Sequence, residues 1–233
     1  NKHILIILSG LLYTASFSPI NFKLGIFFSL SIFFYILLSC KRKQAIILSY
    51  IYGVSIFTSG VSWIYTSIYY YGGGSLVTSL LMTVSLIMFL SLFIAPLGFF
   101  LNKHYKDKSL ITLLVIPSAW VALELFRSII LGGFPWLIAG HSQEGTIFNI
   151  IYPIAGSYFV SLLICTISIG TTLFFKSGLC KSNLKNIFML IIFFNILYFY
   201  NPVWSINKKD PLKISILQPN INAAIKYSDD QID

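Results

Sequence analysis

The stretch Pro117-Ser-Ala-Trp-Val-Ala-Leu-Glu-Leu-Phe-Arg-Ser-Ile-Ile-Leu-Gly-Gly-Phe-Pro-Trp-Leu-Ile-Ala-Gly-His-Ser-Gln143 decides the fold, because it places two opposite charges inside an apolar run and then breaks. Glu124 and Arg127 are three residues apart, so on a helix they share one face. An ionisable residue inside a membrane helix is costly and therefore indicates a candidate site. The helix is expected to stop at Leu131, because Gly132-Gly133-Phe134-Pro135-Trp136 supplies two permissive glycines, a proline, and two aromatics typical of a membrane boundary.

The composition predicts an integral membrane protein. The 233 residues are 57% hydrophobic and only 10% charged, which excludes an ordinary soluble domain of this size. The formal net charge of +9 does not indicate a nucleic-acid partner, because the basic residues form short clusters between apolar runs. Clusters of this kind are typical of topology signals. The first apolar run has no small-residue cleavage site, so it is not expected to be a removable signal peptide.

The apolar runs predict an all-α polytopic membrane protein with seven transmembrane helices, or in any case an odd number. A span needs about 20 predominantly apolar residues. The run Tyr69-Tyr70-Tyr71-Gly72-Gly73-Gly74 after the third helix is either a mobile flap over a lipid-filled cavity or an ordinary loop. The expected helices are residues 4–20, 24–39, 45–65, 76–101, 110–131, one within 148–175, and 186–200.

Basic residues alternate between the two ends of these helices. The loops after helices two, four and six contain three lysines or arginines each, whereas those after helices one, three and five contain Lys23 alone. The positive-inside bias therefore places the N-terminus in the cytoplasm, and residues 72–74, 132–143 and the tail after Asn201 on the outer face. The residues counted on the cytoplasmic side are Lys41, Arg42, Lys43, Lys103, Lys106, Lys108, Lys176, Lys181 and Lys185.

The tail has the pattern of a second domain. Residues 212–218 alternate in the manner of a β-strand, and Pro219-Asn220 ends the alternation. A strand needs partner strands, which the rest of the chain is not expected to supply. The expected organisation is a helical domain at 1–201, a linker at 202–210 and the beginning of a truncated outer domain at 211–233.

Neither a catalytic residue nor a metal or cofactor site is expected in the chain. Cys40 and Cys180 lie in or beside basic loops, and Cys165 is in the middle of a helix with no base near it. The three histidines are far apart with no ligand spacing, and His141 is better explained as a loop or interface residue than as a ligand.

Motifs along the whole chain carry a resemblance to a known family. The most specific is Gly133-Phe134-Pro135-Trp136-Leu137, followed by Gly140-x-Ser142-Gln143. The others are Phe17-Ser18-Pro19, Gly60-Val-Ser-Trp63-Ile-Tyr65-Thr-Ser67 with Gly72-Gly73 after it, Pro117-Ser-Ala-Trp120 with Glu124-x-x-Arg127, and Ser215-Ile-Leu-Gln218-x-Asn220-Ile221 with Lys226-Tyr227. Together they resemble the bacterial apolipoprotein N-acyltransferase family. That family usually has Lys-Trp where this chain has Lys226-Tyr227, which keeps an aromatic side chain but not the indole.

The resemblance implies an enzyme that transfers an acyl chain from a membrane phospholipid to the α-amine of a lipoprotein's diacylglyceryl-cysteine. It implies a cysteine thioester intermediate, a glutamate base and a lysine at the oxyanion. These residues belong to a periplasmic α/β nitrilase-like (carbon-nitrogen hydrolase) domain and fall beyond Asp233. The chain is therefore expected to lie in the bacterial inner membrane with its tail in the periplasm. It is expected to be inactive unless a C-terminal half is supplied, for example one encoded by a separate gene.

The candidate substrate-binding residues lie on the expected outer side, and each has two interpretations. Glu124 and Arg127 form a structural ion pair, or Arg127 reaches the periplasmic mouth and binds a headgroup phosphate. The turn at 133–136 is an interfacial anchor, or it supports the second domain with Trp136 on an acyl chain. Trp63 and Tyr65 are belt residues or substrate contacts. The full set is Trp63, Tyr65, Glu124, Arg127, Gly133, Phe134, Pro135, Trp136, Gln143 and Tyr227.

Three functions remain open at this point, in order of preference. The first is the membrane portion of a truncated or split N-acyltransferase. The second is a non-catalytic membrane binding or scaffold protein derived from that family. The third is a small transporter whose path is lined by Glu124 and Arg127, although no inverted repeats are visible in the sequence.

Overall fold

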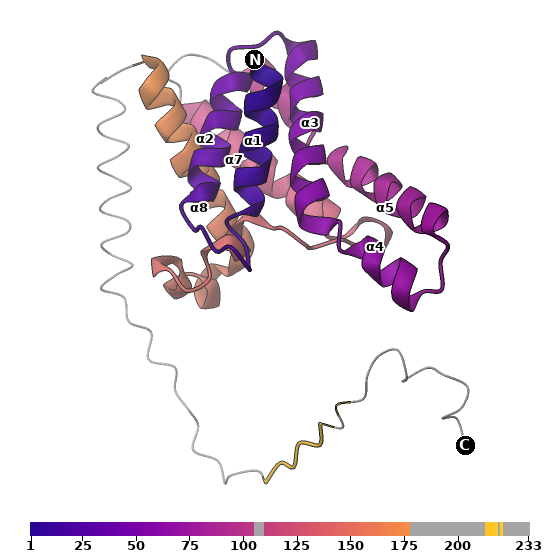
Figure 1. The fold of residues 1–233 in the computed structure, drawn as a ribbon. Coiled ribbons are helices and arrows are strands. Elements are labelled where there is room, and N and C mark those ends of the chain that lie inside the picture. Colours follow the sequence, from indigo (N-terminus) through magenta and orange to yellow (C-terminus); the bar gives the residue numbers. More distant parts are fainter. Residues whose placement is uncertain (105–109, 178–212, 219, 221–233) are drawn as a thin grey trace.

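The structure, a computed structural model, describes residues 1–104, 110–177, 213–218 and 220. Its α-helices all lie within residues 1–104 and 110–177 and form a bundle with irregular turns at one end (Figure 1). The tail drawn in yellow includes residues 213–218, which form no strand; Ile214, Ile216 and Leu217 are exposed. The helices in chain order are α1 (Lys2–Thr14), α2 (Gly25–Leu37), α3 (Arg42–Val61), α4 (Ile64–Thr66), α5 (Leu76–Ser91), α6 (Leu97–His104), α7 (Leu110–Arg127) and α8 (Tyr152–Ser177). Four shorter segments are not α-helical. One is a π-helical turn, η1 (Ser67–Tyr71), and three are 3₁₀-helical turns, η2 (Ile130–Gly132), η3 (Ala139–Gln143) and η4 (Ile147–Ile150).

Helix α1 is the centre of the N-terminal part of the bundle. The Asn1 side chain caps the helix by accepting a hydrogen bond from the His3 backbone N–H. Its buried residues, Ile6, Ser9, Gly10 and Tyr13, follow the spacing of one helical face. This face packs against α2 and α3, so the three helices share one core.

Buried hydroxyl groups link these three helices. Ser9 Oγ donates to the carbonyl oxygen of Ser29 at 2.8 Å, and Ser29 Oγ lies 2.6 Å from the carbonyl oxygen of Ser9. The hydroxyl of Tyr52 on α3 lies 2.7 Å from Ser29 Oγ. Because a buried polar group without a partner is costly, this cluster fixes how α1, α2 and α3 pack against each other.

Only some of the helices reach the length of a membrane span. Helices α3 and α8 are long and apolar enough to cross a bilayer, whereas α1, α2 and α5 are apolar but shorter. The 13 residues of α1 extend over about 20 Å, compared with about 30 Å for the hydrocarbon core of a bilayer. The seventh expected helix, residues 186–200, lies outside the described residues, so the count of seven stays a prediction.

The prediction of one continuous helix over residues 76–101 is wrong. Two helices, α5 and α6, cover this region, and the chain turns between them at residues 92–96. Pro96 has no N–H to continue the helical hydrogen bonds, and short turn bonds such as Leu97 N–H to the Ile94 carbonyl replace them. As a result α5 points away from the bundle in Figure 1, while α6 packs on α3 and α7.

Other predicted boundaries shift by a few residues. Helix α1 ends at Thr14, because residues 15–24 form a series of turns, and α3 ends at Val61 before the separate short helix α4. Helix α7 ends at Arg127 rather than at residue 131. Leu131 has a left-handed backbone conformation (φ 54°), which cannot continue a right-handed helix. Helix α8 begins at Tyr152 and is interrupted at Gly156 (φ 74°).

Small residues allow close approach between α3 and α6. A Cβ atom placed on Gly98 would lie 2.4 Å from the carbonyl carbon of Ala45, so the two backbones are in contact. In contrast, a Cβ atom on Gly170 of α8 would meet no atom closer than Leu113 at 3.9 Å. These two helical glycines therefore provide a matched pair for testing the packing.

We expect Gly98→Ala to destabilise the folded chain in detergent by about 1–3 kcal/mol, because the added methyl group forces α3 and α6 apart. Gly170→Ala should be neutral or slightly stabilising, since alanine is the better helix former. Thermal unfolding followed by circular dichroism measures both. Equal melting temperatures for the two variants would contradict the close contact.

Candidate functional site

Helix α7 brings two charged side chains into the interior of the bundle. The exposed fractions of Glu124 and Arg127 are 5% and 4%, although most of the surrounding residues are apolar. As the sequence predicts, the two residues lie on one helix near its C-terminal end, three positions apart. Their charges must be satisfied locally, because burial of an unpaired charge is expensive.

Arg127 binds the loop that follows α7, residues 133–139. Its Nη1 atom donates to the carbonyl oxygens of Phe134 at 2.5 Å and of Trp136 at 2.6 Å. The Phe134 backbone N–H donates back to the Arg127 carbonyl oxygen at 2.9 Å. The guanidinium carbon also lies 5.3 Å from the centre of the Phe57 ring on α3. One side chain therefore holds two carbonyl groups of the loop against the end of α7.

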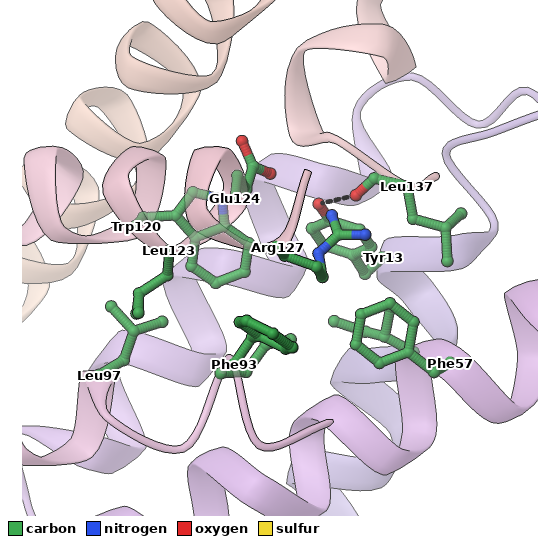
Figure 2. Close-up of a pocket in the computed structure, with 11 residues that line it drawn as sticks. Tyr13, Phe57, Phe93, Leu97, Trp120, Leu123, Glu124, Arg127 and Leu137 are labelled. Atoms are coloured by element: carbon green, nitrogen blue, oxygen red, sulfur yellow. Dashed lines mark hydrogen bonds between the residues drawn. The ribbon is translucent and has the colours of Figure 1, made fainter. Parts of the chain in front are cut away.

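Glu124 binds the other end of the same loop. Its Oε1 atom accepts a hydrogen bond from the Ala139 backbone N–H at 2.8 Å. Figure 2 shows its carboxylate directed away from the guanidinium of Arg127. Each charge thus contacts backbone groups of opposite polarity on the 133–139 loop, and the two side chains together act as a clamp on it.

Further hydrogen bonds attach the loop to the rest of the bundle. The Tyr13 hydroxyl of α1 donates to the Leu137 carbonyl oxygen at 3.0 Å, the bond drawn as a dashed line in Figure 2. On the α8 side, the Gly140 N–H donates to Ser161 Oγ at 2.8 Å, and the Tyr152 hydroxyl donates to the Gly140 carbonyl oxygen. Gln143 is buried and its Nε2 donates to the carbonyl oxygen of Lys23 at 2.9 Å.

The backbone of the loop requires special conformations. Gly133 has a positive φ of 79°, and a Cβ atom there would lie 2.1 Å from the Ser128 carbonyl oxygen, so only glycine fits. Leu131 and Leu137 also have positive φ values, 54° and 58°. Non-glycine residues rarely adopt this region, and they remain there because the clamp and the Tyr13 bond hold the loop on both sides.

Aromatic side chains gather on the exposed side of the loop. The rings of Phe134 and Trp136 are 5.4 Å apart, and Trp63, which precedes α4, is 6.2 Å from Trp136. Both tryptophans are about half exposed, at 48% and 50%. Tyr65 instead stacks on Tyr69 at 5.6 Å. We call Trp63, Phe134 and Trp136 the aromatic rim.

A cavity lies on the inner side of the clamp (Figure 2). Its volume is only about 20 Å³, and it is lined mainly by apolar side chains from α1, α3, the turn between α5 and α6, and α7. Trp120 Nε1 and Glu124 Oε2, one helical turn apart, are buried and have no hydrogen-bond partner among the described residues. The lining residues are Tyr13, Ile56, Phe57, Phe93, Ile94, Leu97, Trp120, Leu123, Glu124, Arg127 and Leu137.

The structure brings together some of the predicted site residues and separates others. Trp63, Phe134 and Trp136 meet in the aromatic rim, while Gln143 reaches the turn between α1 and α2, and Tyr227 lies outside the described residues. The sequence did not reveal Tyr13 or Phe93 as part of the site. Two sequence features could have pointed to them. Tyr13 lies on the apolar face of α1, and Pro96, shortly after Phe93, breaks the helix there.

The described residues offer no group of three metal-ligating side chains. Cys165 is fully buried in α8, and Cys40 lies between α2 and α3 at the other end of the bundle from the loop. Partial burial lowers the pKa of His141, and the carboxylate of Glu144 offsets part of this shift.

The fold and the site define a helical protein with helices of membrane-spanning length and a loop held by buried charges. Residues 9–170 match the family model described as the apolipoprotein N-acyltransferase N-terminal domain. The chain belongs to the apolipoprotein N-acyltransferase family, a family of acyltransferases.

Individual relatives agree with this assignment. Proteins named apolipoprotein N-acyltransferase from Methylococcus capsulatus, Coxiella burnetii and Haemophilus influenzae are 29%, 27% and 30% identical to this chain. The aligned regions cover 94%, 98% and 97% of this chain, but only 44%, 48% and 44% of the relatives. The chain therefore spans about half the length of the curated relatives it matches.

We expect Arg127→Met to release the 133–139 loop, because the Phe134 and Trp136 carbonyl groups lose their donor and Glu124 keeps a buried charge. The cost should be on the order of 3 kcal/mol. Hydrogen exchange measured by mass spectrometry should rise in peptides that cover residues 128–140. Arg42→Met, which removes an arginine 3.9 Å from the Phe99 ring, is the control and should leave these peptides unchanged. Equal exchange of the loop in Arg127→Met and the parent chain would refute the clamp.

Proposed function

We propose that the chain is the membrane portion of an apolipoprotein N-acyltransferase, and that the aromatic rim receives the acyl chain of the phospholipid donor. The observation that supports this most directly is the clamp of Glu124 and Arg127. It holds Phe134 and the half-exposed Trp136 beside Trp63, next to a largely apolar cavity. The relatives' name implies transfer of an acyl group to the amine of an apolipoprotein.

A location in the inner membrane is supported by the surface of the bundle. Helices α3 and α8 have the length and hydropathy of spans. Large apolar side chains are exposed along several helices, which is unfavourable in water but suits contact with lipid. Examples are Leu5, Leu8, Phe28, Ile47, Leu81, Val84 and Leu114. On the proposed orientation the N-terminus is cytoplasmic, and the 133–139 loop and the tail are periplasmic.

The chemistry of the rim fits a lipid acyl donor. Tryptophan rings have a large apolar body and a polar N–H, and they settle where the hydrocarbon region meets the headgroups. An acyl chain lying against Trp63 and Trp136 would have the cavity beside it, where the walls are formed by Phe57, Phe93 and Leu123. In this proposal the rim makes the substrate contacts. The tyrosine-glycine run after α4 belongs to the same outer surface.

We assign Glu124 and Arg127 a positioning role in this function. The Nη1 atom of Arg127 is bound to two carbonyl groups, and Glu124 Oε1 is bound to an N–H of the loop. Both side chains act on the substrate through the position of Phe134 and Trp136. The lipoprotein acceptor and the thioester chemistry belong to the remaining part of the enzyme, which corresponds to the length of the relatives that this chain does not cover.

Reconstitution of acyl transfer tests the proposed function. The chain and the remaining portion of the enzyme, produced separately and combined in proteoliposomes, should transfer an acyl group to a diacylglyceryl lipopeptide, and the chain alone should not. In this assay Trp136→Ala should lower kcat/KM by about ten-fold, since loss of an aromatic contact with the acyl chain costs roughly 1–2 kcal/mol. Phe175→Ala, which removes an exposed aromatic ring from α8, is the matched control. Transfer by the chain alone, or equal activity of both variants, would contradict the proposal.

Thiol labelling tests the orientation. In a background without the native cysteines, Glu144→Cys and Ser215→Cys should react with a membrane-impermeant maleimide added outside spheroplasts. Lys43→Cys should react only after the membrane is broken. All three positions are exposed in the structure, so a lack of reaction reports the side of the membrane rather than burial. Labelling of residue 144 only from the cytoplasmic side would reverse the proposed topology and remove the rim from the outer leaflet.

A further inference from the structure

One close contact between α3 and the 133–139 loop lies next to the aromatic rim. Gly60 is in the last turn of α3, and a Cβ atom placed on it would lie 2.4 Å from Leu137 Cδ1 and 3.1 Å from Leu137 Cδ2. Carbon atoms in ordinary contact are about 3.5–4.0 Å apart, so any side chain at residue 60 would have to displace Leu137. The Leu137 side chain therefore packs directly on the α3 backbone.

On the α3 side, this contact is linked to Trp63 by a short stretch of right-handed backbone. Trp63 follows Gly60 by three residues. Between them, Ser62 has φ −57° and ψ −21°, and Trp63 itself has φ −58° and ψ −21°. The Tyr65 backbone N–H donates to the Ser62 carbonyl oxygen at 3.1 Å and closes the turn. The position of Trp63 is therefore fixed relative to the point where Leu137 touches the helix.

On the loop side, Leu137 is the direct neighbour of Trp136 and has little room to move. Its carbonyl oxygen accepts a hydrogen bond from the Tyr13 hydroxyl at 3.0 Å, and its backbone has a positive φ of 58°. The cavity beside its side chain has a volume of only about 20 Å³, roughly the space of one water molecule. A group added at Gly60 is therefore expected to push the loop, and Trp136 with it, away from α3.

The rings of Trp63 and Trp136 are too close together to hold a hydrocarbon chain between them. Their centres are 6.2 Å apart, and their planes are inclined by 42°. A methylene group needs about 3.5–4.0 Å from each ring, so a chain between the two would require a separation of about 7–8 Å. A chain that contacts both rings must therefore lie across their exposed edges, where neither ring limits its width.

We propose that the contact between Gly60 and Leu137 determines the acyl-chain specificity of the aromatic rim, by keeping the two tryptophan rings too close for a chain to enter between them. This inference rests on the proposed function. A chain lying across the rim is contacted from one side only, so a methyl branch is tolerated about as well as a straight chain. Gly60 and Leu137 are positioning residues, because they act on the substrate through Trp63 and Trp136.

A small displacement is enough to change this specificity. Moving Leu137 by about 1 Å would restore an ordinary contact with a methyl group at residue 60 and bring the ring separation to about 7 Å. A slot of that width admits a straight hydrocarbon chain between the two rings but not a methyl-branched one. Gly60→Ala is therefore expected to make the rim selective for straight chains.

Circular dichroism of the chain in detergent tests the contact without any activity. The exciton couplet of the two indole rings is identified as the part of the spectrum that Trp63→Phe removes. Gly60→Ala should reduce this couplet to about two-thirds, because the Coulombic coupling of two dipoles falls with the cube of their separation. Gly170→Ala, where a Cβ atom would meet no atom closer than 3.9 Å, is the matched control and should keep the parent couplet. The double variant Gly60→Ala/Leu137→Ala lacks the colliding Cδ atoms and should recover it. An unchanged couplet in Gly60→Ala, or no recovery in the double variant, would overturn the proposal.

The reconstituted acyl-transfer assay tests the specificity, with phosphatidylglycerol donors that carry either straight saturated or mid-chain methyl-branched acyl groups. The parent should use both donors with kcat/KM values within about two-fold. Gly60→Ala should favour the straight chain by about five-fold, mainly through a lower KM, because the chain gains a second ring face. Gly60→Ala/Leu137→Ala should return to the parent ratio. The same donor ratio in the parent and in Gly60→Ala would overturn the specificity role. A parent that transfers from neither donor would refute the proposed function and the specificity role with it, while a couplet that responds as expected would leave the contact itself supported.

Discussion

The burial of two opposite charges in an apolar bundle is the constraint on which the site depends. Glu124 and Arg127 have lost almost all contact with solvent, and each contacts backbone groups that themselves need partners. The carbonyl groups of Phe134 and Trp136 and the N–H of Ala139 belong to a loop with no helical hydrogen bonds to satisfy them. Charge and loop therefore satisfy each other, and a helix in place of the loop would leave both side chains unpaired.

This mutual dependence extends to elements far apart in the sequence. Tyr13 on α1 and Gln143 in η3 form hydrogen bonds across more than a hundred residues, and Tyr152 and Ser161 hold the loop from α8. The hydroxyl cluster of Ser9, Ser29 and Tyr52 then fixes α1 against its neighbours. The position of the aromatic rim is set by the whole described bundle rather than by the residues next to it.

The sequence predicted the helices more successfully than the contacts between them. Apolar runs located five of the seven expected helices, the fourth being divided in two and the seventh lying outside the described residues. The three-residue spacing placed Glu124 and Arg127 correctly on one helix. The break at Pro96 was missed, although a proline late in a long apolar run is a physical reason for one. The partners of the two charges were not predictable, because they are backbone groups that no residue type identifies. The left-handed conformations of Leu131 and Leu137 likewise result from tertiary contacts rather than local preference.

The bend between α5 and α6 has a consequence for the lipid around the protein. The 16 residues of α5 extend over about 24 Å, and Figure 1 shows that the helix leaves the bundle at a steep angle to α3. It packs mainly on α3 and otherwise presents apolar side chains outward. In a bilayer crossed by α3, this oblique helix would occupy only part of the depth, so it would displace lipid beside the bundle rather than span the hydrocarbon core.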